Sequence, residues 1–163
     1  MTDPVTLRPA RAQDRDALLH ILDATFRSTW EPELTAEANA AFRASARVAD
    51  YVDGYWQEFV VAESAGELVG MVHWQGDFIG ALHVDPRQAR RGIGSALLRH
   101  AEAGMLAEGV KIAQLETDTF NLKARGFYAA HGYAEAAQYP DEEWNSGLTT
   151  VLMVKALQSP SQP

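Results

Sequence analysis

Residues 84–98 carry the clearest chemical signal in the chain, a pair of glycines beside two arginines. Gly92 and Gly94 allow the backbone to approach a ligand closely. The first N–H groups of a helix have no partner within the helix and lie at the positive end of its dipole, so a helix that starts at these glycines favours an anion. With Arg90 and Arg91 beside them, we interpret the segment as a cradle for a pyrophosphate. The alternative is a plain turn flanked by solvated arginines.

The elements that must position this cradle follow from the neighbouring apolar pattern. An alternating run over residues 78–84 ends at Asp85-Pro86, because proline has no N–H for a strand ladder and moves its neighbour out of helical geometry. An apolar stripe at helical spacing then predicts a helix over residues 95–107. The cradle is therefore expected between the end of a strand and the start of a helix.

Alternation and helical spacing predict the remaining elements. The other strands are expected at residues 5–8, 58–63, 68–74, 111–117, 133–139 and 148–156, and the other helices at residues 18–26, 34–49 and 122–131. Residues 51–59, which are aromatic and contain Gly54, are expected to form a loop. This order predicts an α/β fold with a mixed, mostly antiparallel central sheet and helices on both faces.

Length and composition limit the classes of protein that fit. The 163 residues suit one domain over residues 1–156, with a Ser/Pro-rich, disordered tail at 157–163. The net charge of −8 argues against a nucleic-acid partner and slightly favours a cationic one. The sequence shows no membrane span and no signal peptide, so we expect a cytoplasmic protein. The absence of cysteine excludes disulfides, thiolate metal sites and a cysteine nucleophile.

Two blocks in this sequence resemble the GNAT superfamily of N-acetyltransferases. The first contains Arg-Arg-Gly-Ile-Gly-Ser-Ala-Leu-Leu at residues 90–98 and is similar to the family pattern Gln/Arg-x-x-Gly-x-Gly/Ala. Ala89 stands at the first position of that pattern, with Gln88 one residue early and Arg90 one residue late. The second block, residues 121–133, resembles the family helix Asn-x-x-Ala-x-x-Phe-Tyr-x-x-x-Gly-Phe/Tyr. The resemblance is strong only from Leu82 to Tyr133.

The resemblance implies a GNAT-like fold and an enzyme that moves an acetyl group from acetyl-CoA to a primary amine by direct attack, without a metal. Tyr128 stands where the family carries a tyrosine that protonates the departing CoA thiolate. Asn121 fits both a helix cap and the family's contact to CoA. The residues that the resemblance assigns to acetyl-CoA are Leu82, Val84, Arg90, Arg91, Gly92, Ile93, Gly94, Ser95, Asn121 and Tyr128.

Acyl transfer to an amine also needs a group that handles its proton. An ammonium with a pKa of about 10.4 costs about 4.6 kcal/mol to deprotonate near pH 7. Glu116, His83 and Asp118 are candidate bases, and strand alternation places Glu116 and Asp118 on one face. The alternative is that these residues are only a solvated strand end, or that a relay of water molecules removes the proton.

Aromatic side chains are candidates for the acceptor pocket, because such pockets are mostly apolar with few polar groups. We predict that Trp74 and Trp30 contact the acceptor. Trp144 lies in an acidic stretch that could cover it. Aromatic residues in the core are the alternative explanation.

Two other functions also fit the sequence. A non-catalytic acyl-CoA-binding module fits the departure at Ala89, and a nicotinamide-dependent oxidoreductase fits Gly92-x-Gly94 with Glu116 about 20 residues further on. Leu97 replaces the third glycine that a nicotinamide site would need. The sequence does not specify whether the acceptor amine belongs to a small molecule or to a protein. A homodimer is also possible.

Overall fold

The computed structural model describes residues 3–142 and 146–158. The chain forms two compact units, Met1–Trp74 with Ala81–Ala101, and Gln75–Gly80 with Glu102–Pro163. Hydrogen bonds join seven strands in the order β1-β2-β3-β4-β5-β7-β6. Trp144 and most of the predicted tail lie outside the described residues, so the expectations for them stay predictions.

The strands of the first unit form an antiparallel run, as the sequence predicts. Leu7 lies opposite Ala62 between the first two strands, and Val61 lies opposite Met71 between the next two. The connection at Ala65 and Gly66 has positive φ at both residues, as a tight two-residue hairpin turn requires. The strands are β1 (Val5–Pro9), β2 (Val60–Ser64), β3 (Glu67–Gln75) and β4 (Phe78–Val84).

The helices of the first unit depart from the sequence prediction in one region. The predicted helix over residues 34–49 is two helices, α2 (Ala36–Ala44) and α3 (Arg47–Tyr55). The expected aromatic loop from residue 51 is wrong at its start, because α3 continues through Gly54. A Cβ at Gly54 would meet nothing within 4 Å, so this glycine is an exposed helical residue rather than a breaker.

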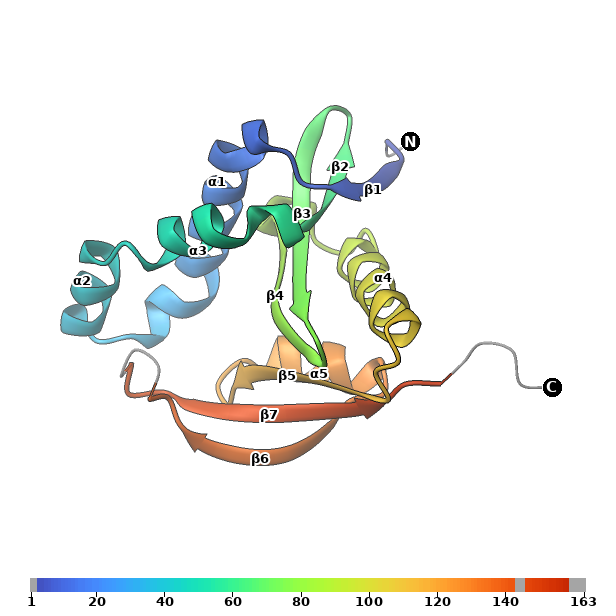
Figure 1. Ribbon diagram of the computed structural model, residues 1–163. Helices are drawn as coiled ribbons and strands as arrows, with labels where there is room; N and C mark the ends of the chain where they lie inside the picture. Colours follow the sequence, from blue (N-terminus) through green and yellow to red (C-terminus); the bar gives the residue numbers. More distant parts are fainter. Residues whose placement is uncertain (1–2, 143–145, 159–163) are drawn as a thin grey trace. The chain divides into compact units, whose positions relative to one another are not determined.

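The helices of this unit cover both faces of its strands (Figure 1). On one face Met71 packs in a cluster with Leu18 of α1 (Arg15–Thr25) and Val52 of α3. On the other face the neighbouring Gly70 has no room for a side chain, because an added Cβ would lie 3.0 Å from Leu97 Cδ1 of α4 (Ile93–Ala107). Successive strand residues point to opposite faces, so one strand packs against two helix layers.

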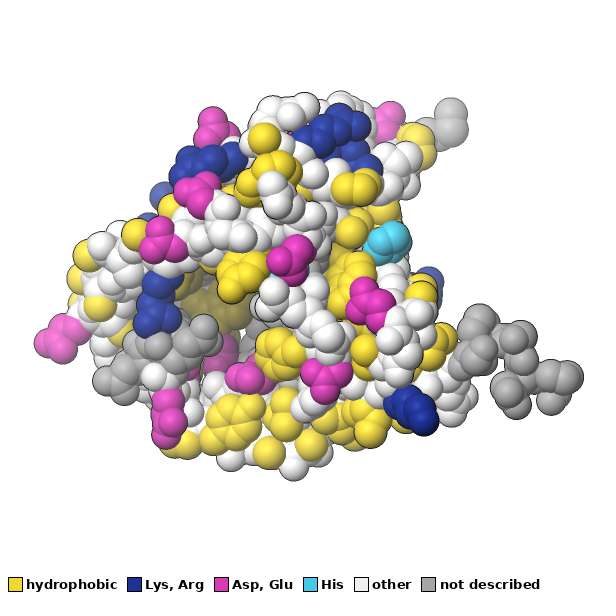
Figure 2. Space-filling view, viewed as in Figure 1, with side chains coloured by type: hydrophobic (Ala, Val, Ile, Leu, Met, Phe, Trp, Pro, Cys, Tyr) yellow, Lys and Arg dark blue, Asp and Glu magenta, His cyan; other side chains and the backbone are white. Residues whose placement is uncertain are grey.

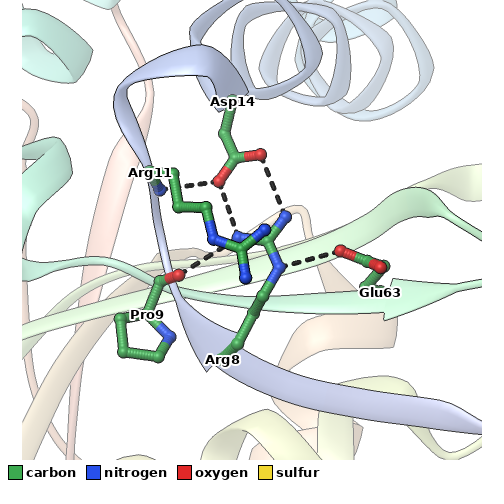
Figure 3. A network of polar contacts seen from close by, with 5 residues as sticks. All are labelled: Arg8, Pro9, Arg11, Asp14 and Glu63. Carbon is green, nitrogen blue, oxygen red and sulfur yellow. Dashed lines mark hydrogen bonds and ion pairs between the residues drawn. The ribbon is translucent and has the colours of Figure 1, made fainter.

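A partly buried ion-pair network connects β1 and β2 to the start of α1 (Figure 3). The Arg8 guanidinium donates to both carboxylate oxygens of Asp14, at 2.8 and 3.0 Å, and to Glu63 at 2.8 Å. The Arg11 backbone N–H also donates to Asp14, at 2.7 Å. The hydrogen bond from Arg8 is the main reason why the pKa of Asp14 is lowered. Asp14 therefore stays ionised although its side chain is only 7% exposed.

The second unit is built on β5 (Ile112–Asp118), with α5 (Leu122–Ala130) after it. β5 runs antiparallel to β7 (Thr149–Ala156), which pairs in turn with β6 (Ala134–Pro140). The start of β4 pairs with β5 in parallel, Phe78 opposite Gln114. These bounds agree with the predicted elements to within one or two residues.

The sheet is mixed and mostly antiparallel, so the predicted fold class is confirmed. The nicotinamide alternative would require a mostly parallel, doubly wound sheet, which the described strands do not form. Among the described residues, no helix is long and apolar enough to cross a membrane. Acidic side chains, in magenta, are spread over the face shown in Figure 2, in keeping with the net charge of −8.

Candidate active site

The predicted cradle begins at Asp85, the residue after the end of β4. The Asp85 carboxylate is 4% exposed and accepts hydrogen bonds from the Arg87 backbone N–H at 2.9 Å and from its guanidinium at 2.8 Å. The hydrogen bond from the Arg87 side chain is the main reason why the pKa of Asp85 is lowered. The Asp85 N–H donates to the Val69 carbonyl. Asp85 thus fixes the turn that leads from the strand into the cradle.

Two residues before α4 have left-handed backbone, with φ of +66° at Arg90 and +77° at Gly92. A non-glycine residue in this region costs on the order of 1–3 kcal/mol, and such strain is concentrated at ligand sites. The Ala96 N–H donates to the Gly92 carbonyl, so the N–H groups of the preceding helical residues point out of the start of the helix. Turns of this kind form concave anion sites, and the backbone therefore fits the expected pyrophosphate.

The two cradle arginines differ in what they contact. The Arg91 guanidinium donates to Gln88 Oε1 and to the Asp3 carbonyl, both at 2.6 Å, and to Ser64 Oγ at 3.2 Å. Arg90 is exposed and forms no ion pair within the described part of the chain. We therefore expect Arg90 to offer a guanidinium to a phosphate, and Arg91 to hold the loop in shape.

His83 on β4 lies beside two residues at the end of α1 and in the π-helical turn that follows it, Phe26–Trp30. Thr25 Oγ1 is 3.0 Å from His83 Nδ1, and the ring centroid of Trp30 is 6.2 Å from that of His83. The structure thus brings together two predicted site residues, Trp30 and His83. Thr25 was missed, because a threonine inside a helical pattern carries no signal of such a contact.

Burial sets the protonation of His83. Desolvation lowers its pKa to about 4, so the imidazole is neutral at pH 7. Full proton transfer from an ammonium with a pKa of about 10.4 to this ring would cost about 9 kcal/mol. His83 is therefore better suited to accept a hydrogen bond from an amine than to take its proton.

The second predicted block forms α5, with Asn121 and Tyr128 at opposite ends. Asn121 Oδ1 accepts a hydrogen bond from the Ala124 N–H at 3.1 Å, so the predicted helix cap is present. The Tyr128 ring packs edge-on against Phe127 and Tyr133, and burial raises its pKa to about 12. Its hydroxyl has no hydrogen-bond partner within residues 3–142 and 146–158, so Tyr128 stays protonated with a donor to offer.

A pocket of about 270 Å³ lies in the second unit around Glu116. Glu116 faces the same side of the sheet as Asp118 and Thr150, because opposite residues on paired strands share a face. Burial, with the charge and hydrogen bond of Glu116, raises the pKa of Tyr139. The lining residues are Glu116, Tyr139, Pro140, Asp141, Glu142 and Thr150. Sequence reasoning found Glu116 but missed the others, since strand pairing rather than local pattern brings them together.

Trp74, the other predicted acceptor residue, packs edge-on against His100 of α4, with ring centroids 6.1 Å apart. The neighbouring His73 points to the opposite face of β3, where its ring nitrogens contact the Tyr51 hydroxyl and Glu58. Within the described residues no group of three or more Asp, Glu or His side chains could hold a metal ion.

Comparison with known proteins agrees with this architecture. The acetyltransferase (GNAT) family profile matches residues 15–133. A blasticidin-S acetyltransferase from Streptomyces morookaense is 40% identical over 95 residues, which is 58% of this chain and 68% of that protein. The uncharacterised Bacillus subtilis protein YdhI is 27% identical over 124 residues, 75% of this chain and 72% of YdhI.

The fold has a close counterpart among solved structures. A GCN5-related N-acetyltransferase from Rhodopseudomonas palustris superposes with a TM-score of 0.78 at 24% identity, over 96% of this chain and 98% of that one. The family match covers both predicted blocks and the cradle between β4 and α4. The chain therefore belongs to the GNAT family of acetyltransferases and is an acyl-CoA-dependent N-acetyltransferase.

Proposed function

We propose that this protein transfers an acetyl group from acetyl-CoA to a primary amine of a small molecule or a protein, by direct attack of the amine on the thioester. The cradle carries the proposal, because its left-handed Arg90 and Gly92 precede α4 inside the region that matches the family. Residues 1–156 act as one catalytic domain in this proposal. A cytoplasmic location and a homodimer stay predictions.

The cradle residues bind the pyrophosphate of CoA in this proposal. Arg90 contributes its guanidinium, and Gly92, Ile93, Gly94 and Ser95 contribute backbone N–H groups at the positive end of the α4 dipole. Arg91 acts mainly by holding Gln88 and Ser64. Leu82 and Val84 contribute backbone groups along β4, and Asn121 adds a contact to CoA beside its role as a cap.

Acetyl-CoA supplies a thioester whose carbonyl carbon is open to attack. As the amine nitrogen bonds to that carbon, the C–S bond breaks and the sulfur leaves as a thiolate, which accepts a hydrogen bond from Tyr128 and takes up a proton from solvent. The amine gives up its own proton to Glu116 or to solvent. Because Tyr128 has a pKa of about 12 and a thiol one of about 8.5, Tyr128 acts chiefly by donating a hydrogen bond to the developing thiolate.

The acceptor is a cationic amine in this proposal. Glu116, Asp141 and Glu142 line one pocket, and carboxylates in a shared pocket favour a positively charged ligand. Trp74 and Trp30 stay predicted acceptor residues, and Trp30 lies beside His83. The name of the Streptomyces relative gives blasticidin S as a first acceptor to test.

The test is release of free thiol from acetyl-CoA with a panel of acceptors. The panel contains blasticidin S, a linear diamine, an amino-acid amide, a peptide with a free N-terminus and a neutral aromatic amine. We expect turnover with at least one cationic amine, and its loss on Glu116→Gln with acetyl-CoA binding kept. Binding of acetyl-CoA without turnover of any amine would favour the non-catalytic module that Ala89 suggests. No binding at all would overturn the proposal.

A further inference from the structure

The contact between Thr25 and His83 restricts where the imidazole proton can lie. Thr25 is the last residue of α1 and is 8% exposed. Its Oγ1 donates a hydrogen bond to the Leu22 carbonyl at 3.1 Å and lies 3.0 Å from His83 Nδ1. A threonine hydroxyl carries one proton and accepts through its lone pairs. Because that proton is donated to the Leu22 carbonyl, Oγ1 can only accept a hydrogen bond from the His83 ring.

The acceptor role of Thr25 determines the tautomer of His83. Nδ1 must carry the ring proton to donate to Thr25, and a neutral imidazole has only one N–H. The lone pair is therefore on Nε2. Within the described residues Nε2 has no hydrogen-bond partner, and it is not among the fully buried unpaired atoms. His83, which is half-buried, thus keeps Nε2 unprotonated.

We propose that Thr25 is a positioning residue that accepts the Nδ1 proton of His83 and so directs the Nε2 lone pair to an N–H of the acceptor amine. This inference rests on the proposed function for its substrate, and adds a residue that neither the sequence motifs nor the family resemblance pointed to. The amine donates the hydrogen bond and His83 accepts it, so no proton is transferred to the ring.

The π-helical turn after Thr25 supports this arrangement. Residues five apart in a regular α-helix lie about 140° apart around its axis, so Thr25 and Trp30 would not share a face. The i→i+5 turn over Phe26–Trp30 is wider, and both residues contact His83. π-Helical turns occur frequently at functional sites. Here the turn places a polar acceptor on one side of the ring and an indole beside it.

The first experiment needs no substrate, and its only variant serves to assign the spectrum. Long-range ¹H–¹⁵N spectra of the imidazole rings distinguish the two neutral tautomers, and His83→Asn assigns the His83 signals. We expect the Nδ1–H form of His83 in the wild type. The Nε2–H form would overturn the proposal, because the lone pair would then be on Nδ1 and Nε2 could not accept a hydrogen bond from the amine.

Thr25 variants test the cause. Thr25→Val removes the acceptor at nearly constant volume and should release His83 into the Nε2–H form, whereas Thr25→Ser keeps the hydroxyl and the wild-type tautomer. Thr29→Val makes the same change within the π-helical turn, where the Thr29 hydroxyl contacts Ser28 rather than His83, and should leave the tautomer alone. An unchanged tautomer in a folded Thr25→Val protein would overturn the role of Thr25.

Kinetics test the consequence for substrate. Loss of one positioning hydrogen bond should lower kcat/KM for the amine roughly tenfold in Thr25→Val, with KM for acetyl-CoA unchanged and Thr25→Ser close to wild type. Wild-type kcat/KM in Thr25→Val with a changed tautomer would overturn the link to the amine. Absence of turnover in the wild type would overturn the proposed function instead, while the tautomer still decides whether Thr25 orients His83.

Discussion

The hydroxyl of Tyr128 is the group that we expect to affect turnover most when it is removed. Tyr128→Phe keeps the ring against Phe127 and Tyr133 and removes only the donor. A general acid contributes about 10²–10⁴-fold, and the raised pKa of about 12 places Tyr128 at the lower end. We expect kcat to fall about 10²-fold with KM for acetyl-CoA little changed, measured by thiol release.

Tyr133→Phe is the matched control for Tyr128. The Tyr133 hydroxyl donates to Glu102 Oε2 at 2.8 Å, and Lys155 donates to the same carboxylate. Its loss should lower the free energy of unfolding by about 1–2 kcal/mol and leave kcat near wild type. Full turnover by Tyr128→Phe, or an equal loss of kcat in both variants, would contradict the proposed role of the Tyr128 hydroxyl.

Asp14 links stability to pH through the network around Arg8. Its folded-state pKa is lowered, so it stabilises the fold above its unfolded pKa of about 3.9. This stabilisation is lost as pH falls through the folded pKa. Asp14→Asn should cost about 2–3 kcal/mol at pH 7, with a smaller difference from wild type below pH 4.

Urea denaturation at pH 7 and pH 3 measures this difference. Asp53→Asn removes an exposed pair with Arg15 and should change stability little at either pH. A difference for Asp14→Asn that does not shrink at pH 3 would mean that packing, rather than the carboxylate charge, accounts for the loss.

The sequence predicts those site residues that belong to a local sequence pattern, such as a helix cap or a motif. Asn121 precedes a helix and caps it, and Tyr128 is identified by its block. Thr25 and Tyr139 have no such pattern, because a long-range contact between α1 and β4 brings Thr25 to His83 and strand pairing brings Tyr139 to Glu116. The guanidinium contacts of Arg91 with Ser64 and Asp3 are long-range too, and sequence reasoning could not separate this arginine from Arg90.

At the scale of elements, the start of α4 is the part most sensitive to a single added methyl group. Gly92 has a φ of +77°, and an added Cβ would meet no atom within 4 Å. Gly92→Ala therefore acts through backbone strain alone, at about 1–2 kcal/mol, and we expect weaker CoA binding because the loop must change its φ to relieve this strain. Thermal unfolding and titration with CoA measure the two effects.

Gly54→Ala is the opposite case on α3. Gly54 also has open space around its Cα, but its backbone is helical, so alanine should stabilise the protein by about 0.5–1 kcal/mol and leave CoA affinity unchanged. Unaltered stability and affinity in Gly92→Ala would show that the left-handed turn is not needed for the cradle.

A comparison of Gly92 with Gly54 shows which element boundaries a sequence can reveal. Proline at residue 86 and the glycines at 92 and 94 marked the end of β4 and the start of α4, because each restricts or frees the backbone locally. Gly54 gives the same signal and yet lies inside a helix, where packing of Val52 against Leu18 outweighs its low helix propensity. The break between α2 and α3 at Ser45 has no comparable signal.

For the whole molecule, the order of elements was sufficient to predict a mixed sheet, since antiparallel hairpins followed by a helical crossover permit few topologies. The pairing of β7 between β5 and β6 could not be predicted this way. This pairing depends on the register between distant segments. Register is specified by a buried face, and β6 is exposed along its whole length, so its sequence carries no signal for the register.

Ligand binding should stabilise the whole protein by an amount that rises with the logarithm of ligand concentration above Kd. A ligand at about 100 times its Kd adds about 2.7 kcal/mol, which raises Tm by roughly 5–10 °C for a chain of this size. We expect this shift with acetyl-CoA and with CoA, and none with NAD, because the mostly antiparallel sheet lacks a nicotinamide site. Gly92→Ala should reduce the shift at the same ligand concentration, whereas Gly54→Ala should keep it. A shift with CoA that Gly92→Ala leaves intact would place the CoA contacts elsewhere than the cradle.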